Sequence, residues 1–385
     1  PGSTPPFARN LIEEGVLIPP TLLIRSGQAC FDTIEKQLTE APYPTRRKDE
    51  NLADLAAQVA STRHGIQRIR DLAGALGTER YLQLAGSVHR NASSAARDAI
   101  RRLGAIDRRV EQRLDDGTPI VLHVRGDGNR LLIDFTGTAS EHPGNFNAPV
   151  AIVTGATVYL MRLLADRRIP MNEGLLEPVD LVVPKGLLDP GFSREPERDP
   201  AVCAGNTETS QRIVDTLLLA FELAASSQGT MNNLLLGNDR FGYYETICGG
   251  AGATARSPGC SAVHTHMTNT RITDPETLEA RYPVRLERFS IRRGSGGAGA
   301  HPGGDGVVRC LKALESLEIS LVGQHRVQAP YGLAEGCPGE TAATRIIRVD
   351  GTIETLGGSA ACTLSTGDRI EVSTPGGGGW GIAPS

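Results

Sequence analysis

Apolar residues recur at helical spacing through the first part of the chain. One series runs from Leu52 to Leu76, and Gly77 ends it. Thr78 opens a second series that continues to Leu103. Two long amphipathic helices joined by a glycine-containing turn predict a helical hairpin.

The pattern then changes to short apolar runs. The runs 120–124 and 131–135 are separated by Gly126-Asp127-Gly128, which predicts a β-hairpin. A helix is predicted from about residue 149 to residue 165, and Asn147 is expected to cap it. A short buried strand is expected at 181–183.

A third long helix is predicted from Asn206 to Ser227, because Ile213, Leu217 and Phe221 face one side. Beyond Gly229 the apolar period changes to two, which indicates strands. The strand candidates are Val284 to Ile291, Val307 to Leu314, Leu317 to Val322, Thr344 to Val349 and Arg369 to Ser373. Helices in the first half and strands in the second predict the α+β class.

Three parts follow from this pattern. Residues 1–50 are rich in proline and predict an extended arm, residues 51–228 a helix-rich part with a β-hairpin, and residues 229–385 a strand-rich part. Two glycine-rich stretches, Gly294 to Gly306 and Pro375 to Gly379, are interpreted as tight irregular turns. The first lacks the GxxxxGK[ST] pattern of a phosphate-binding loop.

Composition narrows the class of protein. The formal charge of −4 over 385 residues leaves no basic stripe, so nucleic acid is not an expected partner. The longest apolar runs are interrupted by polar residues, so no membrane span is expected. The 7 cysteines are widely spread, which favours reduced thiols and a cytoplasmic location over a disulfide framework.

The most polar stretch of the chain is His264 to Glu276, which contains two imidazoles, an amide, a guanidinium and carboxylates. His264 and His266 would share one face if they lay on a strand, as in a metal pair or a base with an orienting partner. A metal site would need a third ligand. The alternative is that one histidine bonds within the fold while the other lines a pocket.

Asn269 and Arg271 continue this polar stretch. A guanidinium can hold a carboxylate or a phosphate through two parallel hydrogen bonds, so Arg271 is a candidate substrate contact. A structural ion pair is the equal alternative for Arg271. Asp274 precedes Pro275 and is expected to cap a short helix.

Candidate contacts also lie outside this stretch. Asn206 and Thr207 stand at a predicted helix start, where backbone amides stabilise anions. Asn232 offers an amide beside Gly229, and Glu245 would be a general base if it were buried.

Six segments, in chain order, resemble the hydantoinase B/5-oxoprolinase family, on its 5-oxoprolinase branch. They are GNTETSQRIVDTLLLAF, GTMNNLLLGND, YYETICGGAGA, HTHMTNTRITDPE, RRGSGGAGAHPGGDG and TPGGGGWG. The resemblance extends from PGSTPP at the start to the glycine-rich end, and matches the C-terminal part of ATP-dependent 5-oxoprolinase. Family members begin with a further segment that carries a catalytic metal site of Asp and His residues, and Pro1 stands where that segment would end.

The resemblance implies an ATP-dependent hydrolase that opens 5-oxo-L-proline to L-glutamate through a phosphorylated intermediate, as in glutathione metabolism. ATP and Mg would bind to a hydantoinase A-like partner chain in a hetero-oligomer, and the divalent metal to the preceding segment, with no metal ligand here. In this chain, His264, His266 and Glu245 would be catalytic. The substrate contacts would be Asn269, Arg271, Asn206, Thr207 and Asn232.

Two other interpretations stay open. The chain could be a non-catalytic or truncated hydantoinase B-like subunit whose role is assembly. It could also serve hydantoinase or carboxylase chemistry on another substrate.

Overall fold

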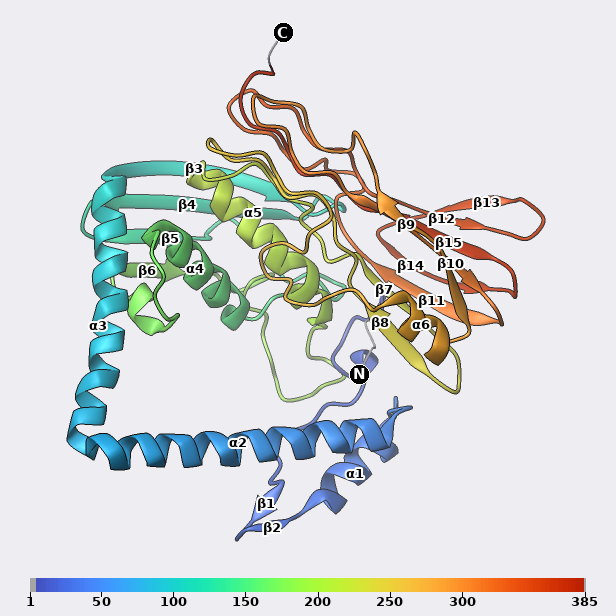
Figure 1. Cartoon of the computed structure of the whole chain (residues 1–385), viewed down its shortest axis with the longest axis horizontal. Coiled ribbons are helices and arrows are strands. Elements are labelled where there is room, and N and C mark those ends of the chain that lie inside the picture. The colour runs from blue at the N-terminus through green and yellow to red at the C-terminus, as the bar shows by residue number, and fades with distance from the viewer. Residues whose placement is uncertain (1–4, 384–385) are drawn as a thin grey trace.

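The computed structural model describes residues 5–383, so residues 1–4 of the predicted arm lie outside it. Helices occupy mainly the first half of the chain and strands the second half (Figure 1). The predicted α+β class is confirmed.

The N-terminal arm is not extended throughout. Its elements are η1 (Ile12–Glu14), β1 (Ile24–Arg25), β2 (Gln28–Ala29) and α1 (Phe31–Glu40). Helix α1 was not predicted, because the surrounding prolines masked its short apolar period. Its residues Ile34 and Leu38 are buried.

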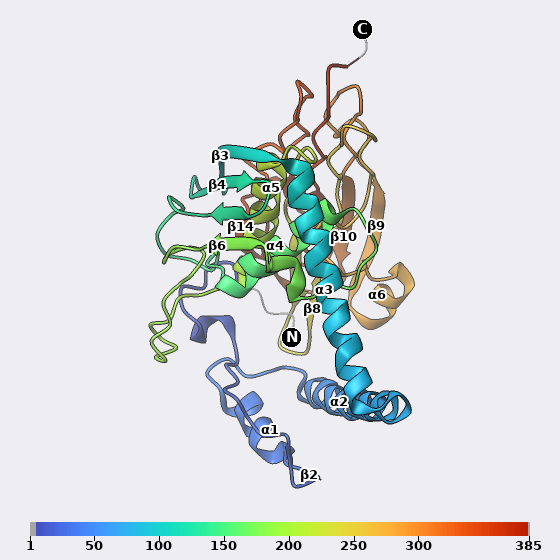
Figure 2. The ribbon, with the colours of Figure 1, turned by 90° about the vertical axis from the view of Figure 1, so that its left-hand side faces the viewer.

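The two long helices are confirmed as α2 (Lys48–Leu76) and α3 (Thr78–Leu103), but the predicted hairpin is wrong. Figures 1 and 2 both show α2 and α3 diverging from their junction instead of lying side by side. Helix α3 buries Ala95, Ala99 and Ile100 against the body, whereas α2 buries no residue. The helices therefore have different partners, and their periodicity does not set the angle between them.

The first hydrophobic core lies between a four-stranded sheet and helices. The strands follow the order β3 (Ala105–Arg113), β4 (Pro119–Asp127), β5 (Leu131–Asp134) and β6 (Val179–Val182). Only the β5–β6 pair of this sheet is parallel. Helices α3, α4 (Val150–Ala165) and α5 (Ser210–Ala220) pack on it, and η2 (Glu173–Leu176) precedes β6.

The β4–β5 hairpin and helix α4 confirm the predictions, but three local details differ. Pro149 is the N-cap residue of α4, while the Asn147 side chain bonds His142, Gly144 and Ala201 and organises the preceding loop. Strand β6 is only half-buried. Helix α5 ends at Ala220, before the predicted end.

The second core lies in the strand-rich half. Helix α6 (Pro275–Arg281) precedes the first strand of one sheet. This sheet contains β9 (Val284–Ile291), β10 (Val307–Ala313), β15 (Arg369–Ser373), β12 (Ala343–Ile347) and β13 (Ile353–Leu356). The other contains β8 (Gly242–Glu245), β7 (Asn233–Gly237), β11 (Leu317–Val322) and β14 (Ser359–Leu364). Side chains such as Leu236, Ile319 and Ile370 fill the space between them. All five predicted strands are present, three with the predicted bounds.

The first glycine-rich stretch opens with a tight turn, in which the Ser295 amide donates to the Arg292 carbonyl at 3.2 Å, but the prediction of turns is wrong for the rest of both stretches. Irregular segments around Gly250, Gly304, Gly336 and Gly377 run side by side beyond the strands, near the C-terminal end in Figure 1. Backbone hydrogen bonds join them, as in the 2.9 Å bond from the Gly377 amide to the Gly304 carbonyl. A Cβ atom at any of these positions would overlap neighbouring backbone, so only glycine fits. We call this arrangement the glycine bundle.

Within residues 5–383, every helix is too short or too polar to cross a bilayer.

Candidate functional site

A buried polar cluster lies where the helix α5 begins. The π-helix η3 (Gly205–Thr209) leads into α5, and together they place Glu208, Arg212 and Asp215 at positions i, i+4 and i+7. These side chains share one helical face, and each is at most 1% exposed. A π-turn inside a helix is frequent at functional sites.

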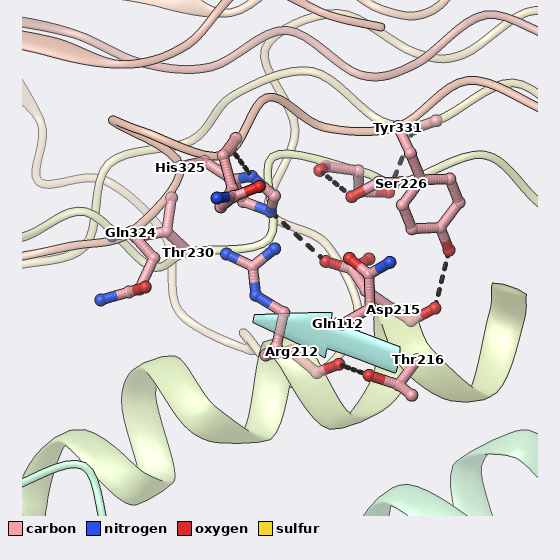
Figure 3. A network of polar contacts seen from close by, with 12 residues as sticks. Gln112, Arg212, Asp215, Thr216, Ser226, Thr230, Gln324, His325 and Tyr331 are labelled. Atoms are coloured by element: carbon pink, nitrogen blue, oxygen red, sulfur yellow. Dashed lines mark hydrogen bonds and ion pairs between the residues drawn. The ribbon is translucent and has the colours of Figure 1, made fainter. Parts of the chain in front are cut away.

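Asp215 stands at the centre of this cluster (Figure 3). Its Oδ2 lies 3.6 Å from Nε2 of His325, and its Oδ1 lies 3.9 Å from Nε2 of His266. Tyr331 donates its hydroxyl proton to the Asp215 backbone carbonyl at 2.7 Å. Three segments that are distant in the sequence therefore meet at this one residue.

The polar groups of the cluster have unused hydrogen-bonding capacity. Within the described chain, neither carboxylate oxygen of Asp215 and neither Nε nor Nη2 of Arg212 has a hydrogen-bond partner. Glu208 accepts hydrogen bonds at Oε1 from the Met231 amide and the Asn233 side chain, while its Oε2 has no partner. Buried polar groups are normally bonded, so these atoms mark a place for bound water or a ligand.

Burial also sets the charges of the cluster. It raises the pKa of Glu208 to about 7, and it lowers the pKa of His325 and of Arg212. Gly229 passes close to Asp215 and His325 with a φ of 56°, and a Cβ atom there would overlap both side chains. Glycine is therefore required beside the cluster.

The residues Val263 to Thr270, here called the histidine loop, lie against the same helices. His264 and His266 are not on a strand: Val263 forms an isolated bridge with Gly249, and His266 adopts a φ of 52°. The expected shared face is therefore wrong.

The two histidines have different surroundings. Nδ1 of His266 lies 3.1 Å from the Tyr159 hydroxyl, and burial lowers the pKa of this histidine. His264 is half-buried, and its Nδ1 has no hydrogen-bond partner among residues 5–383. Burial also lowers the pKa of His264, so both rings favour the neutral form.

Several contacts fix the histidine loop. Gln211 donates its side-chain amide to the Thr265 carbonyl at 3.2 Å and to the Thr268 hydroxyl at 2.7 Å. The hydroxyls of Thr246 and Thr270 bond each other. The loop is thus held by α4, α5 and the segment after β8.

Asn269 and Arg271 lie on the exposed side of this region. Neither side chain forms a hydrogen bond or ion pair with another described residue, so a structural ion pair does not hold Arg271. Asp274 caps α6 (Pro275–Arg281): its Oδ1 accepts from the amides of Glu276 and Thr277 at 3.0 and 3.1 Å. The predicted cap is confirmed.

The helix start, where an anion contact was predicted, already binds a carboxylate of the same chain. Oε1 of Glu14, from the arm, accepts hydrogen bonds from the amides of Val202 and Cys203 at 2.9 and 2.6 Å. Asn206 is exposed beside this end, and Thr207 is buried with an unpartnered hydroxyl oxygen.

The structure gives Asn232 and Glu245 internal partners. Asn232 donates to the Gln228 side chain at 3.0 Å and to the Ile247 carbonyl at 3.2 Å. Glu245 is buried, accepts from Arg309 at 2.6 and 3.0 Å, and accepts from the Tyr243 hydroxyl at 2.8 Å. Both carboxylate oxygens of Glu245 therefore have partners within the chain.

No three His, Cys, Asp or Glu side chains of the described residues are placed to hold a metal ion together. A cavity of about 750 Å³ lies elsewhere, between the arm, α2 and Gly242, and no residue of the buried cluster lines it.

Arg212, Asp215, His325 and Tyr331 were not predicted as site residues. The spacing of Glu208, Arg212 and Asp215 in an otherwise apolar helix was the available signal.

The chain belongs to the hydantoinase B/oxoprolinase family, whose model matches residues 1–383. It is 39% identical to 5-oxoprolinase 1 of Arabidopsis thaliana over 99% of this chain and 32% of that protein. It is 37% identical to 5-oxoprolinase of Dictyostelium discoideum over 99% of this chain and 30% of that protein. The chain thus spans about a third of the length of these curated relatives.

The fold is also found in a solved structure. The ATP-dependent caprolactamase from Pseudomonas jessenii superimposes with a TM-score of 0.85 at 24% identity, over 100% of this chain and 70% of that chain. At this identity the likeness establishes the fold alone.

Proposed function

We propose that this chain forms one wall of the catalytic site of an ATP-dependent cyclic-amide hydrolase that opens 5-oxo-L-proline to L-glutamate. The similarity to 5-oxoprolinases along almost the whole chain supports the substrate class. The observation that carries the site is the histidine loop, where Nδ1 of half-buried His264 has no hydrogen-bond partner among residues 5–383 and His266 lies against Tyr159 and Asp215.

The chemistry explains the need for ATP. A ring amide is a poor electrophile, and transfer of the ATP γ-phosphoryl group to its oxygen, with release of ADP, makes the ring carbon reactive. One water adds to this carbon, and the C–N bond breaks as the nitrogen takes up a proton. A second water cleaves the resulting acyl phosphate, so the products are L-glutamate, ADP and phosphate.

Each residue has a role in this proposal. Arg271 binds the substrate carboxylate or the transferred phosphoryl group through its guanidinium, and Asn269 adds an amide contact. His264 is neutral, so it can accept a proton from the attacking water. His266 positions the loop. The nucleotide and Mg bind to a hydantoinase A-like partner chain or region.

Arg271→Ala tests this assignment. In the protein that contains this chain together with its ATP-binding part, the variant should lower kcat/KM for 5-oxo-L-proline by about 100-fold, because a charged contact is worth roughly 2–3 kcal/mol. Release of ADP that depends on 5-oxo-L-proline measures this. Arg256→Ala, which replaces another exposed arginine, is the matched control.

Full activity of Arg271→Ala would remove this residue from the site. Wild-type protein that releases ADP with hydantoin or caprolactam, but not with 5-oxo-L-proline, would overturn the substrate assignment.

A further inference from the structure

Helix α2 carries an apolar stripe that the rest of the described chain covers only in part, at its N-terminal end. None of its 29 residues is buried, and Ile66, Ile69 and Leu76 are 45%, 53% and 40% exposed. Figures 1 and 2 show the helix projecting from the body. Helices in proteins derive most of their stability from packing an apolar face, so this stripe requires a partner.

The spacing of the stripe identifies the partner as another helix. Apolar or small residues alternate at intervals of three and four, which is the a and d pattern of a coiled coil over four heptads. The positions are Leu52, Leu55, Val59, Thr62, Ile66, Ile69, Ala73 and Leu76. A seam of this kind packs knobs into holes against a second helical seam.

The charges of α2 select its orientation and its partner. Its first third is net acidic and its second half net basic. The first third contains Lys48, Asp49, Glu50 and Asp54, and the second half contains Arg63, Arg68, Arg70 and Asp71. Within residues 5–383, Asp49, Asp54, Arg68 and Arg70 form no ion pair. Two antiparallel copies would place each acidic end beside a basic half, whereas two parallel copies would place like charges together.

We propose that two copies of this chain associate through antiparallel α2 helices, around a two-fold axis near Ser61. In this register Ile69 packs against Leu52 of the second copy and Ile66 packs against its Leu55. The first residues of the stripe are half-buried because α1 packs beside them, and part of each side chain stays open to the partner. Such an interface is isologous, since each helix presents the same two surfaces to the other.

Light scattering of the full chain after size exclusion tests the contact. The wild type should have twice the mass of one chain, and Ile69→Asp should raise the dimer dissociation constant at least about tenfold by placing a charge in the seam. Ala57→Asp, on the opposite face of α2, is the matched control and should leave the dimer intact. Circular dichroism verifies that each variant is folded.

A charge exchange tests the antiparallel register. Arg70→Glu alone should weaken the dimer, and Arg70→Glu combined with Asp49→Arg should restore it. A tighter dimer for Arg70→Glu would indicate parallel helices and overturn the proposal, as would failure of the double variant to restore association. A monomeric wild type, or an Ile69→Asp dimer of unchanged affinity, would overturn it as well.

Discussion

Asp215 connects the two halves of the molecule through a single side chain and its carbonyl. It belongs to α5, which packs in the first core, while His325 and Tyr331 follow β11 of the second. His266, near the other carboxylate oxygen, belongs to the histidine loop. The position of that loop therefore depends on how the two halves meet. We expect a substitution of Asp215 to change the position of His264 as well.

Glu208 predicts a dependence of stability on pH. Burial raises its pKa to about 7 from the ordinary 4.5, so the folded state keeps a proton that the unfolded state has lost. The contribution of Glu208 is full below pH 4.5 and is lost as the pH rises through 7. Glu208→Gln removes this titration. The wild type should therefore lose about 1–3 kcal/mol more of its free energy of unfolding between pH 5 and pH 8 than the variant does.

Urea unfolding of the wild type and of Glu208→Gln at both pH values measures this effect. Glu276→Gln, at an exposed position, is the control and should follow the wild type. His266 and His325 act in the opposite direction, because their lowered pKa values make their contribution disappear as the pH falls below about 6.5. Equal shifts in stability at both pH values for Glu208→Gln would contradict the prediction.

Local chemistry at single residues could be predicted, and distant contacts could not. Asp274 caps α6 with groups two and three residues away, so the sequence around it is sufficient. Asn147 looked like a similar cap, but one of its bonds reaches Ala201. The partners of Asp215 lie more than fifty residues away along the chain, and no period in the sequence relates them.

At the scale of elements, period-two alternation located five strands of the second half, while β7, β8, β13 and β14 were not predicted. Strand β3 was missed because charged residues fill its exposed positions and leave only Ile106 and Val110 as strong apolar signals. The relation of α2 to α3 was mispredicted because it depends on which surfaces each helix contacts. The π-turn of η3 has no recognised pattern, so it was read as ordinary helix.

The glycine bundle makes its own prediction. Gly377→Ala should destabilise the strand-rich half by several kcal/mol, roughly 3 or more, because a methyl group there would overlap the Ala251 carbonyl. Thermal unfolding measures the loss. Gly191→Ala is the matched control, since it has open space around it and should change the melting temperature little. Similar melting temperatures for both variants would show that the glycine bundle accommodates a methyl group without loss of stability.

At the scale of the whole molecule, the two hydrophobic cores correspond to the helical first half and the strand-rich second half. The boundaries of the three predicted parts stay a prediction. The arm is joined to the first core by Glu14, which bonds the start of the helix that carries Asp215. The position of the arm is therefore linked to the position of the helix that carries Asp215.

The proposed function predicts a partner for the whole molecule. Purification from the native source, followed by mass spectrometry, should recover an ATP-binding hydantoinase A-like polypeptide or region together with this chain. In the proposed function, the nucleotide binds to that part. Recovery of this chain alone would favour the assembly interpretation over the catalytic one.

The glycine bundle also restricts how the gene can change. Every base substitution at the first or second position of a glycine codon replaces glycine with a residue that has a side chain, or with a stop. Because many of these glycines have backbone at the place of a Cβ atom, nearly all such substitutions would be removed by selection. The segments that contain least side-chain chemistry should therefore diverge most slowly between species.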